Sequence, residues 1–430
     1  MKFLAGQRRR KYERGQIVLL LAFSMIVLTV SVGLALDFAF AYVTRARLSK
    51  AVDAACLTGM KNLALGQTTA QALAISAFNV NYAGLNDAGP PSVNVAFATN
   101  TYSNLVVNVT GTANMNTMFM ALLPGFRTLT ISDSAQALRG KLVMSLALDR
   151  SGSMSNNGGA AALPTAVTMF VNDFSNTNDE VSMASFASNA KLESAINYNF
   201  ISPITTAVNG MTFAGGTFGL GGLNIAKAQE DSIPMQTGQN MVKVVVYFTD
   251  GLVNEIQSTL SCNGTPTVYN LGGYDSGTDV GFFNPTTGTQ IYRYDGSRYW
   301  YTCSTDDPNC STQTNSSCLR NDAGFTSAID GTIKTFTRAH VTADAQYQSQ
   351  QTANALLAAG DYVYSIGLGT KPDQTFLKEI ANDPTSDIYN PNLPQGMAQF
   401  VTDCPSTACT ADLQQVFQII ASRVLLRLTQ

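Results

Sequence analysis

The sequence reads LVMSLALDRSGS over residues 142–153. Its first seven residues are almost all apolar, which predicts a strand that is buried on both faces. Asp149, Ser151 and Ser153 follow at alternate positions, so that one carboxylate and two hydroxyls can converge just past the end of the strand. Oxygen ligands of this kind suit a hard divalent cation such as Mg²⁺. Because a loop rich in Ser and Gly is also an ordinary turn, the pattern indicates a metal site only in combination with further ligands.

The C-terminal part of the chain alternates apolar strands with helices. Strands are predicted at residues 143–148, 181–186, 242–248 and 362–366. Helices are predicted at residues 164–174, 219–230, 340–359, 374–381 and 413–428. This alternation predicts an α/β fold with a parallel sheet that is covered on both faces. Ligands of such sheets bind beyond the carboxyl ends of the strands, and Asp149 follows one such end.

Two further loops offer the same kind of ligand. The triplet GGT at residues 215–217 precedes a predicted helix; its glycines permit a close backbone approach, and Thr217 presents a hydroxyl. The triplet TDG at residues 249–251 follows the strand at 242–248 and supplies Asp250. In a doubly covered sheet all three loops can lie along one edge. Two carboxylates and three hydroxyls then suit one divalent ion with oxygen ligands.

Together, the three loops resemble the metal-ion-dependent adhesion site of von Willebrand factor type A (vWA) domains in their order, their spacing and their flanking strands. The resemblance covers about residues 142–428 and implies a Rossmann-like domain, with a mostly parallel central sheet, that binds Mg²⁺, or Mn²⁺ or Ca²⁺. It implies hydroxyl ligands at Ser151, Ser153 and Thr217. It implies carboxylates that act directly or through water at Asp149 and Asp250. In this family a carboxylate from a partner protein can complete the coordination.

The N-terminal region predicts a membrane anchor. Residues 17–36 carry no charge and are long enough to span a bilayer as a helix. The helical pattern continues to about residue 64, which favours an uncleaved anchor over a cleaved signal peptide. Basic residues precede the span, at Lys2, Arg8, Arg9, Arg10, Lys11 and Arg14. They predict a single-pass protein of the bacterial inner membrane, with a cytoplasmic N-terminus and a periplasmic or extracellular C-terminal domain.

Four short stretches resemble the N-terminal region of TadG-like proteins of the bacterial Tad (Flp) pilus-assembly system. They are GQI at 15–17, GLALD at 33–37, RARL at 45–48 and AVDAACL at 51–57. Proteins of this kind often join such an anchor to a type A domain. Leu20 stands where related pseudopilins have a Glu, so we expect the chain to stay in the membrane rather than to be processed by a prepilin peptidase.

The sequence divides into four predicted regions. They are a basic cytoplasmic tail at 1–14, the anchor and its continuing helix at 15–64, a small α+β segment at 65–140, and the type A domain at 141–430 with an insertion at about 255–335. Within the α+β segment, helices are predicted at 71–82 and 115–123, and strands at 93–97, 105–109 and 129–131. The small residues at 51–55 permit close packing, either on a partner helix or on the α+β segment.

Six cysteines lie in the predicted exported part: Cys262, Cys303, Cys310, Cys318, Cys404 and Cys409. An even set in irregular sequence of an exported protein predicts disulfide bonds and a disulfide-rich insertion. Cys404 and Cys409 are close enough to close a small loop, whereas the other four leave three connectivities open. A zinc site is disfavoured because the chain has no C-x-x-C pair.

These features predict a non-enzymatic membrane protein. Only 13% of the residues are charged and the net charge is −3, which argues against nucleic-acid binding. His340 is the only histidine, and no G-x-S-x-G motif accompanies it. The leading hypothesis is a Tad pilus or secretion component that binds a pilus-assembly protein, or a surface ligand offering a carboxylate, through its metal. The alternatives are a minor pilin-like scaffold stabilised by the metal and a metal-dependent hydrolase, which the lack of a base or nucleophile disfavours.

Overall fold

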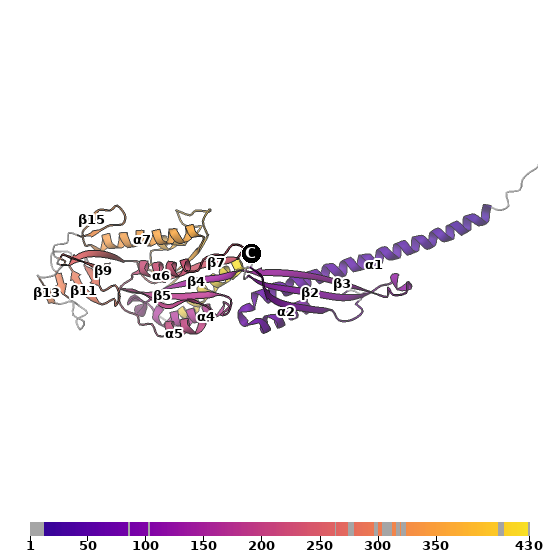
Figure 1. Cartoon of the computed structure of the whole chain (residues 1–430), viewed down its shortest axis with the longest axis horizontal. Coiled ribbons are helices and arrows are strands. Elements are labelled where there is room, and N and C mark those ends of the chain that lie inside the picture. The colour runs from indigo at the N-terminus through magenta and orange to yellow at the C-terminus, as the bar shows by residue number, and fades with distance from the viewer. Residues whose placement is uncertain are drawn as a thin grey trace, which may run out of the picture. The chain divides into compact units, whose positions relative to one another are not determined.

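The chain folds into two compact units, which are shown in Figure 1. Unit 1 comprises Met1–Thr99 and Val106–Leu138, and unit 2 comprises Asn100–Leu105 and Arg139–Gln430. The computed structural model describes residues 13–428, apart from 85–86, 102–103, 263, 274–278, 296–299, 303–311, 315–318, 320–323 and 403–407.

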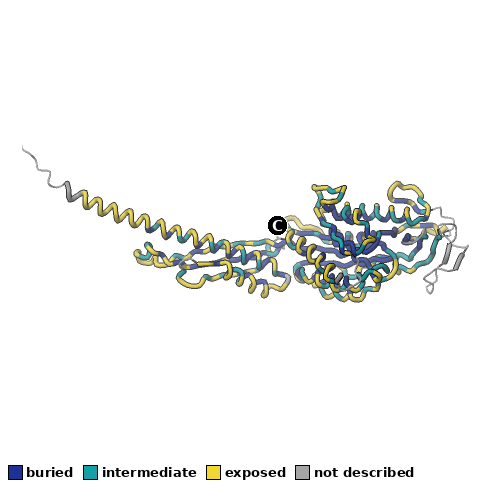
Figure 2. The backbone as a smooth tube through the Cα atoms, turned by 180° about the vertical axis from the view of Figure 1, so that it is seen from behind, coloured by how far each residue is buried: buried dark blue, intermediate teal, exposed yellow. Residues whose placement is uncertain are grey.

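Unit 1 is built on one long helix, α1 (Glu13–Lys61), of 49 residues. Within the described residues, α1 is the one helix whose length and composition would let it cross a membrane. Its apolar first half is mostly exposed, from Ile17 at 62% to Leu36 at 44%, and only Gly33 in this run is buried (Figure 2). Its second half is amphipathic and packs against the rest of the unit, so one helix serves two environments.

The core of unit 1 lies between α1, the helix α2 (Gln67–Asn81) and a three-stranded sheet. The strands are ordered β1 (Ser92–Thr99), β2 (Leu105–Asn116) and β3 (Thr128–Arg139). Small residues of α1, including Ala51 and Ala55, are fully buried in this core with Phe78 of α2 and Val107 of β2. The small residues at 51–55 therefore pack within unit 1, which was one of the two alternatives. A short turn, η1 (Leu63–Leu65), joins the two helices.

The helix predicted at 115–123 is wrong. Met115 is the penultimate residue of β2, and only one 3₁₀ turn follows, η2 (Met120–Leu122). The reason is a tertiary contact: the carboxylate of Asp37 on α1 accepts the backbone N–H groups of residues 118, 119 and 120. A helix that began at residue 115 would need the N–H groups of residues 119 and 120 for its own hydrogen bonds.

Unit 2 contains a six-stranded sheet. Its order is β17 (Met397–Val401), β16 (Tyr362–Leu368), β7 (Met241–Thr249), β4 (Lys141–Asp149), β5 (Glu180–Phe186) and β6 (Ala190–Asn197). All neighbouring pairs are parallel except β5 and β6, which are antiparallel. The sheet is mostly parallel, as predicted, and β4, β5, β7 and β16 are its four predicted strands.

Helices cover both faces of this sheet. Leu146 of β4 packs in a core with α4 (Gly159–Asn172), α5 (Ile201–Asn209) and α9 (Ala408–Leu428). The next residue, Ala147, packs in a second core on the opposite face. The helices of that second core are α6 (Gly219–Asp231), α7 (Arg338–Ala359) and α8 (Gln374–Ile380). Successive residues of a strand point to opposite faces, so the apolar run of β4 serves both cores.

The insertion is more regular than the sequence predicts. It forms an antiparallel sheet in which strands follow one another in chain order. The strands are β8 (Glu255–Cys262), β9 (Thr265–Gly273), β10 (Val280–Phe283), β11 (Gln290–Tyr294), β12 (Trp300–Thr302) and β13 (Thr312–Thr314). A small hairpin follows, β14 (Phe325–Thr326) and β15 (Ile333–Lys334). Leu271 and Phe282 join the core beneath α7, which attaches the insertion to unit 2.

The disulfide prediction lies outside the described residues. Cys303, Cys310, Cys318 and Cys404 are not described, and neither are the side chains of Cys262 and Cys409. The seventh cysteine, Cys56, is a buried free thiol in the core of unit 1.

Candidate metal centre

The two candidate carboxylates follow neighbouring strands. β4 and β7 pair in parallel, with Leu148 beside Phe248, so their carboxyl ends reach the same edge of the sheet. Asp149 and Asp250 come at or just after those ends and are 0% and 1% exposed. The strand register therefore places two acidic side chains side by side in the interior.

Two serine hydroxyls from the loop after β4 reach the second carboxylate. Ser151 Oγ and Ser153 Oγ donate to Oδ1 of Asp250 over 3.2 Å and 2.8 Å, and they lie 3.0 Å from each other. The alternate spacing of these serines places both hydroxyls on the same side of the loop, as the sequence predicts.

Asp149 is oriented by its own hydrogen bonds. Its Oδ1 accepts the backbone N–H of Ser151 over 2.7 Å, and its Oδ2 accepts the hydroxyl of Thr249 over 2.6 Å. Thr249 belongs to the TDG triplet, but the sequence pattern predicts no role for its hydroxyl. Asn157 was missed as well; its Nδ2 donates to Oδ2 of Asp250 over 2.6 Å, and no motif pointed to it.

Thr217 joins the same site from the loop before α6. The hydroxyls of Thr217 and Ser153 both lie close to Gly251, the residue after Asp250. Measured from the position that a Cβ atom of residue 251 would occupy, Thr217 Oγ1 is 3.3 Å away and Ser153 Oγ is 3.9 Å away. The backbone N–H of Thr217 donates to Oδ1 of Asn254 over 3.2 Å, which holds the loop in place. All five residues of the predicted ligand set therefore meet at one edge of the sheet.

The electrostatics of the two carboxylates favour a cation. Burial raises the pKa of Asp149, and the nearby charge of Asp250 raises it further. Burial likewise raises the pKa of Asp250. Two adjacent buried carboxylates are costly to ionise together without a positive charge between them.

The donor chemistry fits a hard divalent ion. No group of three or more His, Cys, Asp or Glu side chains is placed to hold a metal among the residues that the structure describes. A cation at this edge would therefore depend on the hydroxyls of Ser151, Ser153 and Thr217 as well as on the two carboxylates. An all-oxygen set of this size suits Mg²⁺, Mn²⁺ or Ca²⁺.

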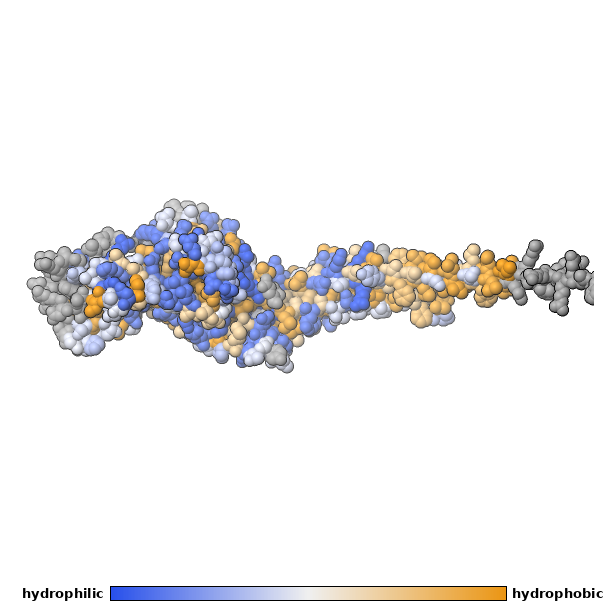
Figure 3. Space-filling view, turned by 90° about the horizontal axis from the view of Figure 1, so that it is seen from above, coloured by the Kyte–Doolittle hydropathy of each residue, from blue (hydrophilic) through white to orange (hydrophobic). Residues whose placement is uncertain are grey.

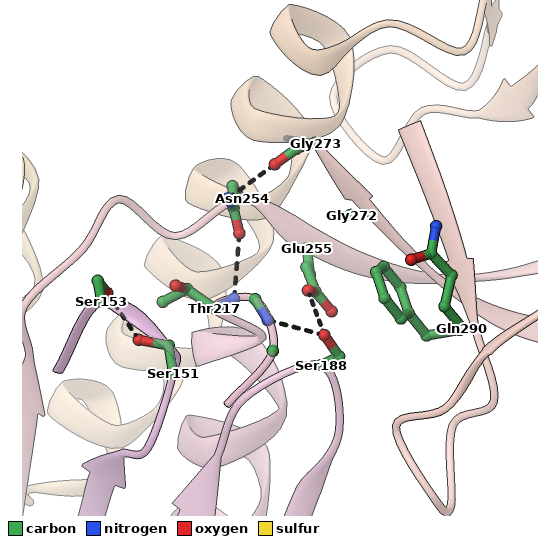
Figure 4. A pocket seen from close by; sticks show the side chains of 12 residues that line it. Ser151, Ser153, Ser188, Thr217, Asn254, Glu255, Gly272, Gly273 and Gln290 are labelled. Atoms are coloured by element: carbon green, nitrogen blue, oxygen red, sulfur yellow. Dashed lines mark hydrogen bonds between the residues drawn. The ribbon is translucent and has the colours of Figure 1, made fainter. Parts of the chain in front are cut away.

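A cavity of about 340 Å³ extends from the serines and Thr217 to the insertion (Figure 4). Its far wall is formed by Phe283 and Gln290. Glu255, the first residue of β8, lies between the two sides and is only 1% exposed. No sequence pattern predicts a role for Glu255, because a single Glu at the start of a strand belongs to no motif.

Glu255 is only partly satisfied by its neighbours. Its Oε1 accepts the hydroxyl of Ser188 over 3.1 Å, whereas its Oε2 is buried without a hydrogen-bond partner. Burial raises the pKa of Glu255 to about 8. A Cβ atom on Gly216 would lie 1.9 Å from Oε1 of Glu255, and one on Gly272 would lie 2.9 Å from it. Glycine at both positions makes room for this side chain.

The opposite flank of the site is basic. A second cavity of about 310 Å³ shares Ser153 and Thr217 with the first and is bordered by Arg338 and Lys371. Lys371 also favours the charged form of Asp250. The candidate metal position thus lies between an acidic flank at Glu255 and a basic flank at Arg338 and Lys371.

Two regions of the chain match known protein families. Residues 144–263 match the von Willebrand factor type A domain, and residues 15–75 match the putative Flp pilus-assembly TadE/G-like family. The chain joins a TadE/G-like region to a type A domain. The type A match contains all five candidate ligands, and the TadE/G-like match contains the apolar part of α1.

Solved structures similar to this chain include three proteins of bacterial pili. The PilB minor pilin from Streptococcus sanguinis is 15% identical with a TM-score of 0.40, and the match covers 79% of each chain. The vWF domain of the type V pili tip protein Mfa5 from Porphyromonas gingivalis is 14% identical with a TM-score of 0.41, covering 68% of this chain and 98% of that one. The pilus adhesin SpaC from Lactobacillus rhamnosus GG is 14% identical with a TM-score of 0.40, over 79% of this chain but only 34% of SpaC. Comparison with curated proteins gives no match.

Proposed function

We propose that the protein is a membrane-anchored, exported component of a Tad pilus or secretion apparatus whose type A domain binds a partner protein or a surface through a divalent metal ion. The observation that carries the proposal is the convergence of two buried carboxylates and three hydroxyls at one sheet edge. The family matches support the pilus context, because a TadE/G-like region precedes the type A domain in one chain.

The binding step is coordination chemistry. Asp149, Ser151, Ser153, Thr217 and Asp250 would hold the ion, directly or through water. Such an ion supplies a coordination position that a carboxylate of the partner fills. The site opens into both cavities through Ser153 and Thr217, which gives that carboxylate a way in.

The two flanks favour a partner with a particular charge pattern. A carboxylate that approaches the ion passes Arg338 and Lys371, whose charge favours an acidic group. On the other side, the unpartnered Oε2 of Glu255 favours a hydrogen-bond donor, such as a lysine or arginine side chain. A partner segment that offers an acidic residue next to a basic one suits both flanks.

The anchor is proposed from α1. The apolar, exposed run at 17–36 is long enough to span the bilayer, and basic residues precede it. That charge pattern supports a cytoplasmic N-terminus, and the TadE/G-like match supports an inner-membrane location. Alkaline phosphatase fused after Gln430 should be active, whereas a fusion at residue 14 should be inactive; the reverse result would contradict the orientation.

Metal-dependent capture tests the binding function. The solubilised full-length protein is used as bait with Mg²⁺ or with EDTA, and the retained proteins are identified by mass spectrometry. We expect specific partners with Mg²⁺ that are lost with EDTA and with Asp149→Ala. The matched control is Asp231→Ala, which removes an exposed aspartate of the same unit that pairs with Lys227. Capture that is indifferent to EDTA and to Asp149→Ala would exclude metal-dependent binding.

The same variants separate the alternatives. In a scaffold that uses the metal only for stability, Asp149→Ala lowers the melting temperature but leaves adhesion and pilus assembly intact at a permissive temperature. Loss of adhesion by a stably folded Asp149→Ala protein would exclude that scaffold. Metal-dependent turnover of an ester or peptide substrate would instead favour a hydrolase.

A further inference from the structure

The loop between β2 and β3 is strongly apolar and exposed. Residues 118–126 read MFMALLPGF and contain no charged side chain. Four of these side chains are at least half exposed: Met118 at 56%, Leu122 at 81%, Leu123 at 52% and Phe126 at 50%. Clustered apolar side chains of this size on a surface mark a binding face.

Contacts with α1 fix where this loop lies. Along β2 the contacts step towards the N-terminus of α1: the Cys56 thiol donates to the Val107 carbonyl, and the Thr44 hydroxyl reaches the Met115 sulfur. The strand thus runs back along the helix towards its apolar half. The loop that follows β2 therefore reaches the part of α1 that is proposed to enter the bilayer.

Two contacts secure the loop at that level. The Asp37 carboxylate, on a residue only 1% exposed, accepts the backbone N–H groups of Met118, Phe119 and Met120 over 2.7–2.9 Å. Next to it, the Phe119 ring packs so closely on Gly33 that a Cβ there would lie 2.4 Å from the ring. Gly33 lies within the uncharged run that ends at Leu36, about 4–5 Å from its end along the helix axis.

We propose that this loop is a second membrane contact, which inserts Leu122, Leu123 and Phe126 into the interface of the same leaflet that α1 leaves. This inference rests on the proposed anchor. The depth of Gly33 matches the shallow insertion of interfacial segments, whose apolar side chains enter about 5–10 Å into the headgroup and acyl boundary. Arg127, which follows the loop directly, suits anionic headgroups.

Lipid is favoured over a protein partner by continuity with α1. The apolar side chains of α1 are exposed all around the helix, and the loop lies beside the last turn of that exposed run. Figure 3 shows hydrophobic surface, in orange, along α1 and at the end of the unit that adjoins it. A bilayer around α1 up to Leu36 would also cover the loop. The helix α1 and the loop would then both contact the bilayer. Together they would fix the tilt of unit 1 relative to the membrane, whereas α1 alone would leave this tilt free.

Tryptophan depth measurements test the loop in the full-length protein. Trp300 is the only tryptophan, so Trp300→Phe gives a silent background. Phe126→Trp measures the depth of the loop, and Leu28→Trp measures the depth of the span. Leu57→Trp is the matched control further along α1, because Leu57 is 63% exposed and Leu28 is 64% exposed. Each variant is placed in proteoliposomes of phosphatidylethanolamine and phosphatidylglycerol, and quenching by brominated lipids is compared with quenching by aqueous acrylamide.

The outcomes separate the loop from the anchor. We expect brominated lipids to quench Phe126→Trp and Leu28→Trp but not Leu57→Trp, with the loop most sensitive to bromines near the headgroups. If Leu28→Trp is quenched by lipid and Phe126→Trp is quenched only by acrylamide, the loop inference fails and the anchor stands. If the loop is shielded from both quenchers, a protein covers it, which also overturns the inference. If Leu28→Trp escapes lipid quenching, the anchor itself fails.

Discussion

Single side chains decide the chemistry of the sheet edge. Asp149 and Asp250 are buried, and each is held by neutral donors: Thr249 for the first, Asn157 and the two serines for the second. Neutral donors orient a carboxylate but do not cancel its charge. The two carboxylates therefore still need a positive charge when both are ionised, whereas aspartates in salt bridges already have one.

Ser153→Ala tests one ligand at this scale. The change removes a hydroxyl and adds neither volume nor charge, so we expect Mn²⁺ affinity to fall by at least about 10-fold, the loss typical when even an outer-shell partner of a metal is removed. Mn²⁺ titration followed by electron paramagnetic resonance measures the affinity. The control is Ser155→Ala, an exposed serine two residues further on. Equal affinity in both variants would remove Ser153 from the ligand set.

Glu230→Gln tests a buried acid away from the candidate metal centre. Glu230 of α6 is 0% exposed; its Oε1 accepts the Ser145 hydroxyl and its Oε2 has no partner. Burial raises its pKa well above 4.5, and nearby Asp361 and Asp231 raise it further, against the charge of Lys243. The folded state favours the neutral form of Glu230. Its contribution to the free energy of unfolding is therefore complete below about pH 4.5. As pH rises towards the folded-state pKa, this contribution is lost by up to about 1.4 kcal/mol per pH unit.

The glutamine variant stays neutral at every pH. We therefore expect it to melt near the wild-type temperature at pH 4 and above it at pH 8, as measured by calorimetry at both pH values. A constant difference between the two proteins across this range would show that Glu230 does not titrate differently on folding.

At the scale of elements, the site depends on how the insertion meets the sheet. Three residues separate β8 from the TDG triplet, and β8 brings Glu255 against the Gly-Gly-Thr loop, while β9 faces the same side chain through Gly272. The strands of the insertion thus form one wall of the cavity next to the candidate metal centre. A longer side chain in that wall would alter what the cavity admits without touching a candidate ligand.

Gly272→Ala tests this packing. Its Cβ would lie 2.9 Å from three atoms of Glu255, so the variant should lose about 1–3 kcal/mol of unfolding free energy, as expected for overpacking. Glu255→Ala removes the atoms that clash, so the double variant should recover most of the loss attributed to Gly272→Ala. Urea denaturation of the four proteins in the cycle measures the coupling. Strictly additive losses would mean that the two residues do not interact.

At the scale of the whole molecule, the proposed metal ion would couple function to stability. A ligand that binds only the folded state stabilises it by about 2.7 kcal/mol when present at 100 times its dissociation constant. We expect Mg²⁺ to raise the melting temperature of the type A unit and EDTA to lower it. Scanning calorimetry of wild type and Asp149→Ala, each with Mg²⁺ and with EDTA, measures these changes in melting temperature. An equal response to Mg²⁺ in both proteins would place the ion elsewhere.

The local patterns in the sequence determined the main elements of both units. The apolar run at 17–36 indicated the exposed half of α1, and the strands β4, β5, β7 and β16 were predicted from runs that are buried on both faces. These predictions succeeded because burial on all sides leaves a signal in consecutive residues. The edge strand β6 was missed because a half-exposed edge strand shows no such run. The helix α5 was missed as well.

Tertiary contacts decided the rest. The Asp37 carboxylate turned a predicted helix at 115–123 into a loop, the insertion became an antiparallel sheet, and Glu255 entered the cavity beside the candidate ligands. For the loop and for Glu255 the controlling contact joins residues that are far apart in the chain, Asp37 with Met120 and Ser188 with Glu255. The spacing of residues in the sequence indicates whether a segment is a helix or a strand, but it does not indicate which distant residue that segment contacts. The sequence therefore predicted five candidate oxygen donors, whereas the tertiary structure decided that the loops after β4 and β7 and the loop before α6 meet at one edge of the sheet.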